Sequence, residues 1–202
     1  MTDLKELLIM EIKNLLYELE SIVGKNNIIS NSLDLEKHNK DWRGFYNNSC
    51  LCVVFPKNTN ILKAIAKYCY ERNIKIVPQG GNTSLTGASV PTYKNEEIII
   101  NFAKMNKILE IDKSNLTILV ESGLILDDLK QCLEKENLYF PIDLSSSGSC
   151  MIGGNIATNA GGINALKYGS MKENILGLEI VTGTGTLITS LSKMKKNNTG
   201  YD

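Results

Sequence analysis

The sequence predicts an α+β (α/β-like) fold of two subdomains behind an N-terminal helix, and three observations support this. Apolar residues recur at helical spacing over residues 3–23. Residues 51–77 read as strand, helix and strand and are followed by another apolar strand, which is typical of a parallel βαβ unit. Beyond residue 104, apolar runs flank short polar turns, which indicates hairpins. A small βαβ-type subdomain should therefore precede a larger, mostly antiparallel one.

The first element is an amphipathic helix over residues 3–23. Asp3 and Glu6 are spaced as a capping box, and Gly24 is placed to end the helix. Most apolar stripes of this kind pack on their own domain, although a membrane-surface or partner helix fits the same pattern. The stripe consists of Leu4, Leu7, Leu8, Ile12, Leu15, Leu16, Leu19 and Val23.

The elements of the first half then follow in order. Residues 25–50 are polar and rich in Asn, with little periodicity. Residues 51–55 form a short buried strand that Pro56 ends, and the next helix places Leu62, Ile65, Ala66 and Cys69 on one face. Further strands are expected at residues 74–77 and 98–100.

The second half predicts two hairpins separated by helices and glycine-rich chain. Residues 108–111 and 116–120 pair around a polar turn, and a helix carries Leu126, Leu129 and Leu133. A long glycine-rich segment runs from residue 140 to 169. A last hairpin turns at residues 183–185, between strands near Leu178 and Leu187.

Composition excludes several classes of function. Hydrophobic residues make up 43% and charged residues 22%, which is globular rather than disordered. The formal net charge is zero, so the basic surface typical of a nucleic-acid partner is missing. Five cysteines without a CxxC pair and a single histidine, His38, argue against a zinc site and favour buried, inert thiols.

The expected compartment is the cytoplasm. Free thiols suit a reducing environment, and no window is long and apolar enough to span a bilayer. The first residues carry Asp3, Glu6 and Glu11, which is unlike a signal peptide or an acid-poor transit peptide.

The most informative stretch is PQGGNTSLTGASVP, residues 78–91, which contains three glycines and no charge. Glycine lets successive backbone N–H groups point into one concavity, and Thr83, Ser84, Thr86 and Ser89 add hydroxyl donors. Such a loop can bind phosphate without a lysine, although an ordinary glycine-rich turn fits equally well. No lysine follows Gly87, so it is not a P-loop, and the chain's one GxG lacks the third glycine of a dinucleotide-binding fingerprint.

A second segment of the same kind, residues 141–162, favours a phosphate-binding loop over an ordinary turn. It again combines glycine pairs, hydroxyls and amides with almost no charge. Ile152, Ile156 and Ala160 recur every fourth residue, so part of it should be a short helix that ends at Gly161 and Gly162. Two such loops in one small chain indicate a long, phosphate-bearing ligand between two subdomains.

Four motifs in order resemble those of one flavoprotein family. They are PQGGNTSLTGASVP, GSCMIGGNIATNAGG, LKYGSMKENILGLEIV and KMKKNNTGYD, with DWRG at residues 41–44 as a further match. The resemblance is to the FAD-linked D-2-hydroxyacid dehydrogenases of the vanillyl-alcohol oxidase and p-cresol methylhydroxylase superfamily, above all the D-2-hydroxyglutarate, D-lactate and glycolate-oxidising branch. It covers residues 41–202.

The resemblance implies an FAD-binding domain with the flavin between its two subdomains. Residues 1–40 would be an N-terminal helical extension, residues 41–104 the first subdomain and residues 105–202 an incomplete second one. Matched to the cofactor loops and strips are Gly80, Gly81, Asn82, Thr83, Ser84, Gly87, Ser89, Pro141, Gly148, Ser149, Gly153, Gly154, Asn155, Thr158, Gly161, Gly162, Tyr168, Gly169 and Val181.

Two departures from the family pattern have consequences. The first loop contains no histidine, which implies non-covalent FAD. Ser84 and Ala88 stand where the branch has glycine, so backbone strain and weaker FAD binding are expected if those positions need a positive φ.

The resemblance also implies what the chain does not carry. The family's substrate domain, with its proton-accepting residues and metal site, has no counterpart in these 202 residues. No catalytic residue and no metal ligand are expected here. His38 is expected at the surface, and Asp41, Arg43 and Tyr168 are expected to be structural.

Three interpretations remain open at this point. The chain can be the FAD-binding part of an enzyme that oxidises a D-2-hydroxyacid (D-lactate, D-2-hydroxyglutarate or glycolate), with the substrate domain supplied separately. It can be a remnant without catalysis. It can be the FAD domain of another flavoenzyme, such as a UDP-N-acetylenolpyruvylglucosamine reductase, which matches the second loop less well.

Overall fold

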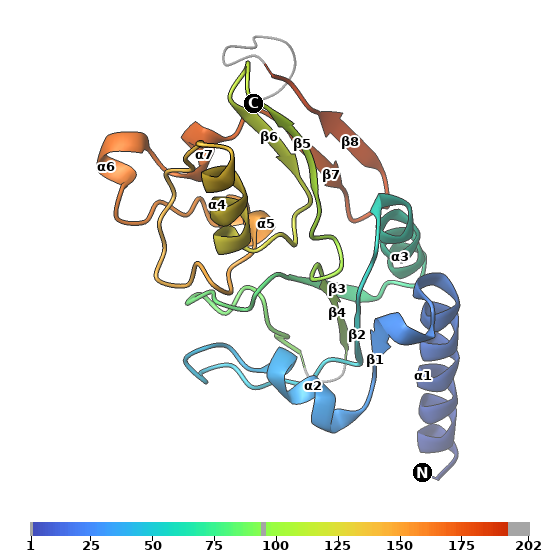
Figure 1. The fold of residues 1–202 in the computed structure, drawn as a ribbon. Coiled ribbons are helices and arrows are strands. Elements are labelled where there is room, and N and C mark those ends of the chain that lie inside the picture. The colour runs from blue at the N-terminus through green and yellow to red at the C-terminus, as the bar shows by residue number, and fades with distance from the viewer. Residues whose placement is uncertain (1, 94–95, 194–202) are drawn as a thin grey trace.

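The first half of the chain forms a four-stranded sheet with the order β1-β2-β4-β3. The computed structural model describes residues 2–93 and 96–193. Strands β2, β3 and β4 are mutually parallel, whereas β1 joins the edge antiparallel to β2 (Figure 1). The bounds are β1 (Ile28–Ile29), β2 (Cys52–Val54), β3 (Lys75–Gln79) and β4 (Glu97–Asn101).

Both faces of this sheet are covered by helices, so the central strands are apolar on both sides. Alternate residues such as Cys52 and Val54 face the helices α1 (Thr2–Val23) and α3 (Thr59–Glu71). Residues between them, such as Val53 and Ile99, pack with Leu35 of α2 (Ser32–Asn39) on the other face. The strands that the sequence predicts at residues 51–55, 74–77 and 98–100 are therefore confirmed.

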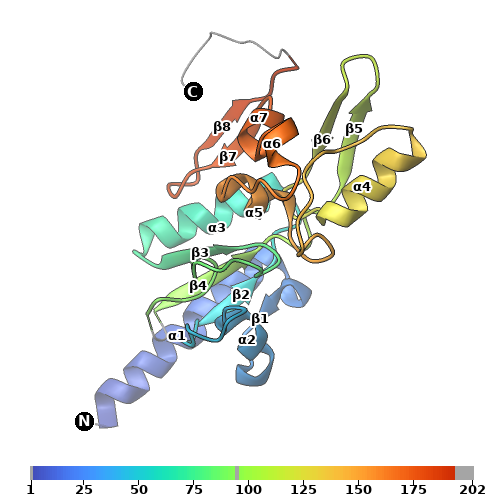
Figure 2. The same cartoon turned by 90° about the vertical axis from the view of Figure 1, so that its left-hand side faces the viewer.

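The second half is built around a separate apolar core. Leu126, Leu129 and Leu133 of one helix pack with Ile142, Ile152 and Met171, below a hairpin that contributes Ile118 and Val120 (Figure 2). Its elements are β5 (Ile108–Asp112), β6 (Thr117–Val120), α4 (Leu126–Lys135), α5 (Ile152–Ala157), α6 (Ala165–Tyr168), α7 (Met171–Asn174), β7 (Leu178–Val181) and β8 (Leu187–Ser190).

Both predicted hairpins are present. Strands β5 and β6 pair antiparallel with an irregularity between Ile108 and Glu110, and β7 pairs antiparallel with β8. The β7–β8 hairpin lies against α3. Thr59 Oγ1 of α3 donates a hydrogen bond to Glu179 Oε1 of β7 at 3.0 Å. The last residues of the KMKKNNTGYD motif, from residue 194 onward, lie outside the described residues.

Residues 25–50 hold regular elements despite their weak apolar periodicity. They form the 3₁₀ turn η1 (Lys25–Asn27), strand β1 and helix α2. Apolar periodicity does not indicate helix α2, because the helix is short and buries one apolar residue, Leu35, so its order comes from caps and polar contacts. The Asn31 side chain accepts from Leu33 N at its start.

Cysteine burial follows the expectation. Cys50, Cys52, Cys69 and Cys150 are buried and Cys132 is half-buried, and all five are free thiols. Burial raises the pKa of Cys50 to about 11 and that of Cys69 to about 12, so these thiols stay protonated and inert near neutral pH.

Candidate cofactor-binding site

The first glycine loop begins at the carboxyl ends of two parallel strands. Gln79 and Asn101 are the last residues of β3 and β4 and pair directly across the sheet. In open sheets with parallel strands, ligands bind outside the carboxyl ends of the strands, where loops diverge. The residues 80–89 that leave β3 therefore lie at the place where such a sheet presents its site.

The two glycine loops touch each other, as the sequence suggests. A Cβ on Gly81 would lie 1.9 Å from the carbonyl oxygen of Ser149, and one on Gly80 would lie 3.4 Å from Cβ of Met151. Only glycine permits such an approach of two backbones. The loops from the two halves of the molecule thus form one continuous surface.

Backbone donors on this surface are free. The N–H groups of residues 81–85 donate to no acceptor within the described part of the chain. These residues are half-buried or exposed, so the donors can reach a ligand. Groups of unpaired N–H donors at a loop are suited to an anion, because each donates to a charged acceptor.

Side chains fasten the two ends of the first loop. Gln79 Nε2 donates to Ser89 O at 2.7 Å, and Ser89 Oγ donates to Asn82 Oδ1 at 2.8 Å. Asn82 Nδ2 donates in turn to Lys40 O at 2.7 Å, beside α2. The side chains of Asn82 and Ser89 are therefore occupied within the protein, and these residues shape the loop rather than offering side-chain donors.

Residues after α2 support the loop from outside, which sequence patterns did not reveal. A Cβ on Gly87 would lie 2.3 Å from the Tyr46 ring, and Asn48 Nδ2 donates to Thr92 O at 3.0 Å. The Asp41 carboxylate accepts from Tyr46 N at 2.8 Å, which lowers the pKa of Asp41 below its usual value. Asp41 thus orders the turn that carries Tyr46, in line with the structural role expected of it.

The expectation that His38 is exposed is wrong. Its side chain has 9% exposure, and Nδ1 lies 2.6 Å from Gln79 Oε1. It was misjudged because histidine outside a motif is normally a surface residue, and nothing in the sequence pairs it with Gln79, 41 positions later. The one sequence feature that hints at a buried polar partner is that polar Gln79 follows closely after an apolar strand.

Backbone strain is not found where it was expected. Ser84 and Ala88 do not adopt a positive φ; within the loop only Asn82, at 54°, and Gly87, at 72°, do so. The side chains of Ser84 and Ala88, where the family has glycine, therefore cause no backbone strain from a left-handed conformation. Gly81 also lacks a positive φ, so close contact with Ser149 and not its dihedral angle demands glycine there.

Several residues of the second segment are structural contacts. Gly153 approaches Ser122, and Gly162, with φ 74°, approaches Asp143 O. Asn155 is buried, and Thr158 Oγ1 donates to Gly154 O at 3.0 Å. The expected short helix is confirmed as α5, although it ends at Ala157, before the glycine pair.

Other predicted residues of this segment lie open. No protein atom lies within 4 Å of a Cβ built on Gly154, and the nearest to one on Gly148 is Asp127 Oδ2 at 3.5 Å. Within the described chain, the N–H groups of Gly148, Gly161 and Gly162 have no acceptor. Pro141 O accepts from Asn164 Nδ2 at 3.1 Å. These positions leave room and donors for a ligand along the second strip.

The remaining predicted residues lie farther along the chain. Tyr168 ends α6 and packs edge-on against Tyr139, and Gly169 follows with φ 78° against the Glu173 side chain. Val181 is the last residue of β7, on the hairpin beside α3. Figure 1 shows α6 and β7 on opposite sides of α5.

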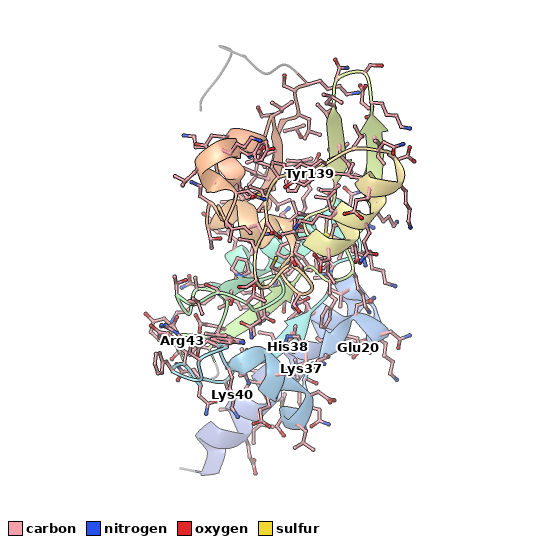
Figure 3. All side chains as sticks on the ribbon, turned by 60° about the vertical axis from the view of Figure 1, so that its left-hand side comes forward. Glu20, Lys37, His38, Lys40, Arg43 and Tyr139 are labelled. Atoms are coloured by element: carbon pink, nitrogen blue, oxygen red, sulfur yellow. The ribbon has the colours of Figure 1, made fainter. Side chains whose placement is uncertain are left out.

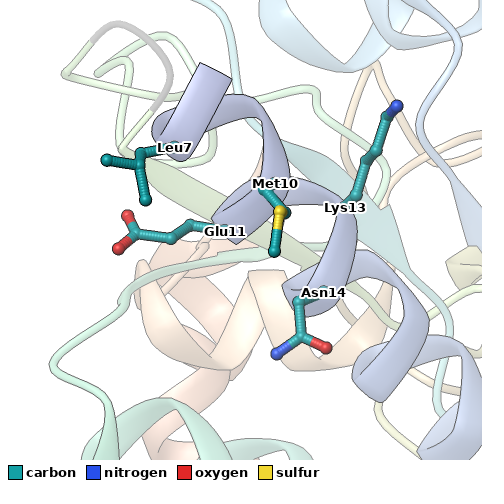
Figure 4. Close-up of a pocket in the computed structure, with 5 residues that line it drawn as sticks. All are labelled: Leu7, Met10, Glu11, Lys13 and Asn14. Atoms are coloured by element: carbon teal, nitrogen blue, oxygen red, sulfur yellow. The ribbon is translucent and has the colours of Figure 1, made fainter. Parts of the chain in front are cut away.

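Two hollows lie away from the first loop, and Pro141 of the second segment lines one of them. The first, about 580 Å³, is lined by Leu7, Met10, Glu11, Lys13 and Asn14 of α1 alone (Figure 4). The second, about 770 Å³, lies between β5–β6, α4 and the chain after α7 and is mostly apolar. Among described residues, no cluster of three metal-binding side chains occurs and no helix is long and apolar enough to cross a bilayer.

The fold is of the p-cresol methylhydroxylase type. The structure superposes on p-cresol methylhydroxylase with a TM-score of 0.74 at 22% identity, covering 88% of this chain and 35% of that one. It superposes on alkyldihydroxyacetonephosphate synthase with a TM-score of 0.79 at 23% identity, covering 86% and 33%. Residues 50–190 match the model of the FAD binding domain, and the chain belongs to that family.

Similar sequences are D-2-hydroxyacid dehydrogenases. The chain is 42% identical over 183 residues to the mitochondrial D-2-hydroxyglutarate dehydrogenase of Arabidopsis thaliana, covering 91% of this chain and 32% of that protein. It is 39% identical over 190 residues to a putative mitochondrial D-lactate dehydrogenase of Schizosaccharomyces pombe, covering 91% and 36%. The chain thus spans about a third of the length of these relatives, and the family resemblance is confirmed.

The expected cytoplasmic location is wrong. The relatives from Arabidopsis thaliana, Bos taurus and Schizosaccharomyces pombe are named as mitochondrial proteins. Acidic residues near position 1 and reduced thiols do not identify a compartment, because mature mitochondrial proteins share both features.

Proposed function

We propose that the two glycine loops hold FAD without a covalent bond, with the diphosphate on residues 80–84. The free N–H groups of residues 81–85, brought against the second loop by the Gly81–Ser149 contact, carry this proposal. Each hydrogen bond from such a donor to a charged oxygen contributes about 1.5–3 kcal/mol, so a few of them suffice without a lysine. The second strip, with Gly148, Gly154 and Gly161, lines the continuation of the cofactor.

A non-covalent cofactor also fits the nucleophiles of the chain. His38 is engaged with Gln79, Cys50, Cys52, Cys69 and Cys150 are buried, and Cys132 is half-buried on α4. Acid precipitation of FAD-loaded protein should therefore release the yellow colour into the supernatant. Flavin that stays with the precipitate would contradict this part of the proposal.

The complete protein, in this proposal, oxidises a D-2-hydroxyacid such as D-lactate, D-2-hydroxyglutarate or glycolate. The relatives' names supply the substrate class, and bound flavin supplies the acceptor of the substrate's hydride. Proton abstraction requires a base within hydrogen-bond reach of the hydroxyl, and the carboxylate requires a positioned cation. Buried His38 cannot serve as that base, so these groups come from the other two-thirds of the relatives' length.

Anaerobic flavin bleaching tests this division of labour. FAD-loaded chain is mixed with each D-2-hydroxyacid, alone and with the remaining polypeptide of a relative added as a separate chain. Bleaching should require both parts. Substrate-dependent bleaching by the chain alone would place the catalytic groups within these residues, and lack of bleaching with both parts present would contradict the proposed substrate class.

A division of the chain near residue 104 remains part of the proposal. Separate apolar cores on either side of this position support two subdomains. The glycine loops then belong one to each subdomain, which places the cofactor between them. Residues 1–40, proposed as an extension, supply α1, β1 and α2, and α2 is the element that holds the first loop.

A further inference from the structure

Below the first loop lies a buried polar cluster that the cofactor motifs do not include. Gln79 is 1% exposed, Asn101 5% and His38 9%, and they meet where β3 and β4 end. Figure 3 shows His38 toward the interior, whereas Arg43 lies at the outer edge of the molecule. Buried polar groups are expensive unless each finds a partner, so the pattern of donors in this cluster is constrained.

The hydrogen bonds fix the orientation of the Gln79 amide. Its Nε2 faces two carbonyl oxygens, His38 O at 2.9 Å and Ser89 O at 2.7 Å. Its Oε1 accepts from Asn101 Nδ2 at 3.1 Å and faces His38 Nδ1 at 2.6 Å. The reverse orientation would set oxygen against carbonyl oxygens and nitrogen against the Asn101 amide nitrogen.

That orientation decides the tautomer of His38. Because Gln79 Oε1 can only accept, Nδ1 must carry the proton. Nε2 is then the bare nitrogen, and it is buried with no hydrogen-bond partner in the described part of the chain. The ring packs edge-on against Phe55, with centroids 5.9 Å apart. A proton on Nε2 would have no acceptor unless the ring turned outward and left Gln79.

Charged groups around the ring do not favour an imidazolium. Burial, followed by the effect of Lys37 on the same helix, lowers the pKa of His38, whereas the Gln79 hydrogen bond raises it. Lys104, from the segment after β4, lies over Phe55 and donates to Asn26 O and Asn27 Oδ1. The Asp41 carboxylate is engaged by backbone N–H groups of Arg43 and Tyr46.

We propose that His38 is a positioning residue for the cofactor loop: its neutral Nδ1–H holds the Gln79 amide, which ties α2 to Ser89 at the far end of the loop. Acidification forces the ring off Gln79, loosens the loop and weakens FAD binding. This inference rests on the proposed FAD site and adds a pH dependence to it.

The fold stabilises the neutral form of the His38 imidazole, and this sets the direction in which pH changes stability and FAD affinity. A histidine whose folded pKa is lowered contributes its full stability above the ordinary value of 6.5 and loses it as the pH falls below that value. FAD affinity and thermal stability should therefore decline together between about pH 7 and about pH 5.

Three proteins test this proposal: untagged wild type, His38→Asn and His38→Phe. An asparagine can present an N–H near the position of Nδ1 but does not titrate. FAD affinity of the wild type should fall severalfold, but by less than about tenfold, from about pH 7.5 to about pH 5.5, because the His38 pKa lies below its ordinary value. His38→Asn should stay within about threefold of the wild-type affinity at the higher pH and lose the pH step. His38→Phe should bind weakly at both values.

Equal losses of affinity on acidification in wild type and His38→Asn would overturn the proposal. A second readout does not depend on FAD: the chain has one histidine, so its imidazole NMR signals report the tautomer and pKa directly. An Nε2–H tautomer, or a pKa at or above 6.5, would also overturn it. If no protein binds FAD, the proposed function fails, while NMR and thermal unfolding against pH still decide the role of His38.

Discussion

At the scale of single residues, glycines at the site serve different purposes, which the sequence alone could not separate. Gly81 lets two backbones meet, Gly87 combines a positive φ with the Tyr46 contact, and Gly154 borders open space. The motif PQGGNTSLTGASVP identified the loop, but which contact each glycine makes depends on residues up to about 70 positions away. Substituting Gly81 by alanine should therefore lower the stability of the fold, whereas substituting Gly154 should not.

Gly81→Ala should destabilise the protein. Its Cβ would meet Ser149 O at 1.9 Å, so the loops must separate, at a cost of about 2 kcal/mol in the free energy of unfolding. FAD affinity should fall at least tenfold, roughly, because the joint surface is disrupted. Gly183→Ala, where no atom lies within 4 Å, is the matched control and should change neither. Thermal unfolding and an FAD titration measure both; unaltered values for Gly81→Ala would show that the loops do not touch.

Gly154→Ala should keep the fold and lose affinity. The new methyl group meets no protein atom, and alanine stabilises a helix by about 1 kcal/mol over glycine. If the open space beside α5 belongs to the cofactor, the methyl group occupies it and weakens FAD binding. The expected pair of results is an equal or higher Tm with a raised Kd for FAD. An unchanged Kd would remove Gly154 from the proposed site.

At the scale of elements, prediction succeeded where apolar periodicity was strong. Strands β2, β3 and β4, helix α3 and both hairpins follow from runs such as residues 98–100 and 51–55. Elements held by caps and polar contacts were missed, above all α2, which buries one leucine. This miss mattered for the site, because α2 carries His38 and the carbonyl that accepts from Gln79, and Lys40 O just after α2 accepts from Asn82.

Helix α3 offers a test of capping that is independent of the site. Asn58 Oδ1 accepts from Ile61 N at 3.0 Å at its start. Asn58→Ala should lower the free energy of unfolding by about 1 kcal/mol, and Asn58→Asp should lose far less, because Asp caps as well as Asn. Chemical denaturation measures the change. Equal losses in the two variants would show that the cap contributes nothing, and FAD affinity should stay unchanged in both.

At the scale of the whole molecule, the two glycine loops touch between two halves that each pack around their own apolar residues. The sequence predicted both glycine segments and a ligand between them, because glycine, amide and hydroxyl residues clustered twice with almost no charge. It could not predict the buried polar cluster that supports the first loop, because the contacts between His38, Gln79 and Asn101 join three segments that are distant in the sequence. The resemblance covers about a third of the relatives' length. That third includes the cofactor motifs, so the resemblance predicts the cofactor better than the substrate.

The central claim is that this chain forms an FAD site through the diphosphate-binding first loop. Titration of FAD into the purified chain, followed by flavin fluorescence, tests it most directly, with riboflavin as the matched ligand without diphosphate or adenine. The account predicts saturable binding of one FAD per chain with a Kd of about 10 µM or lower, and riboflavin weaker by at least about a hundredfold. Absence of FAD binding at about 50 µM, or riboflavin binding as tightly as FAD, would contradict it.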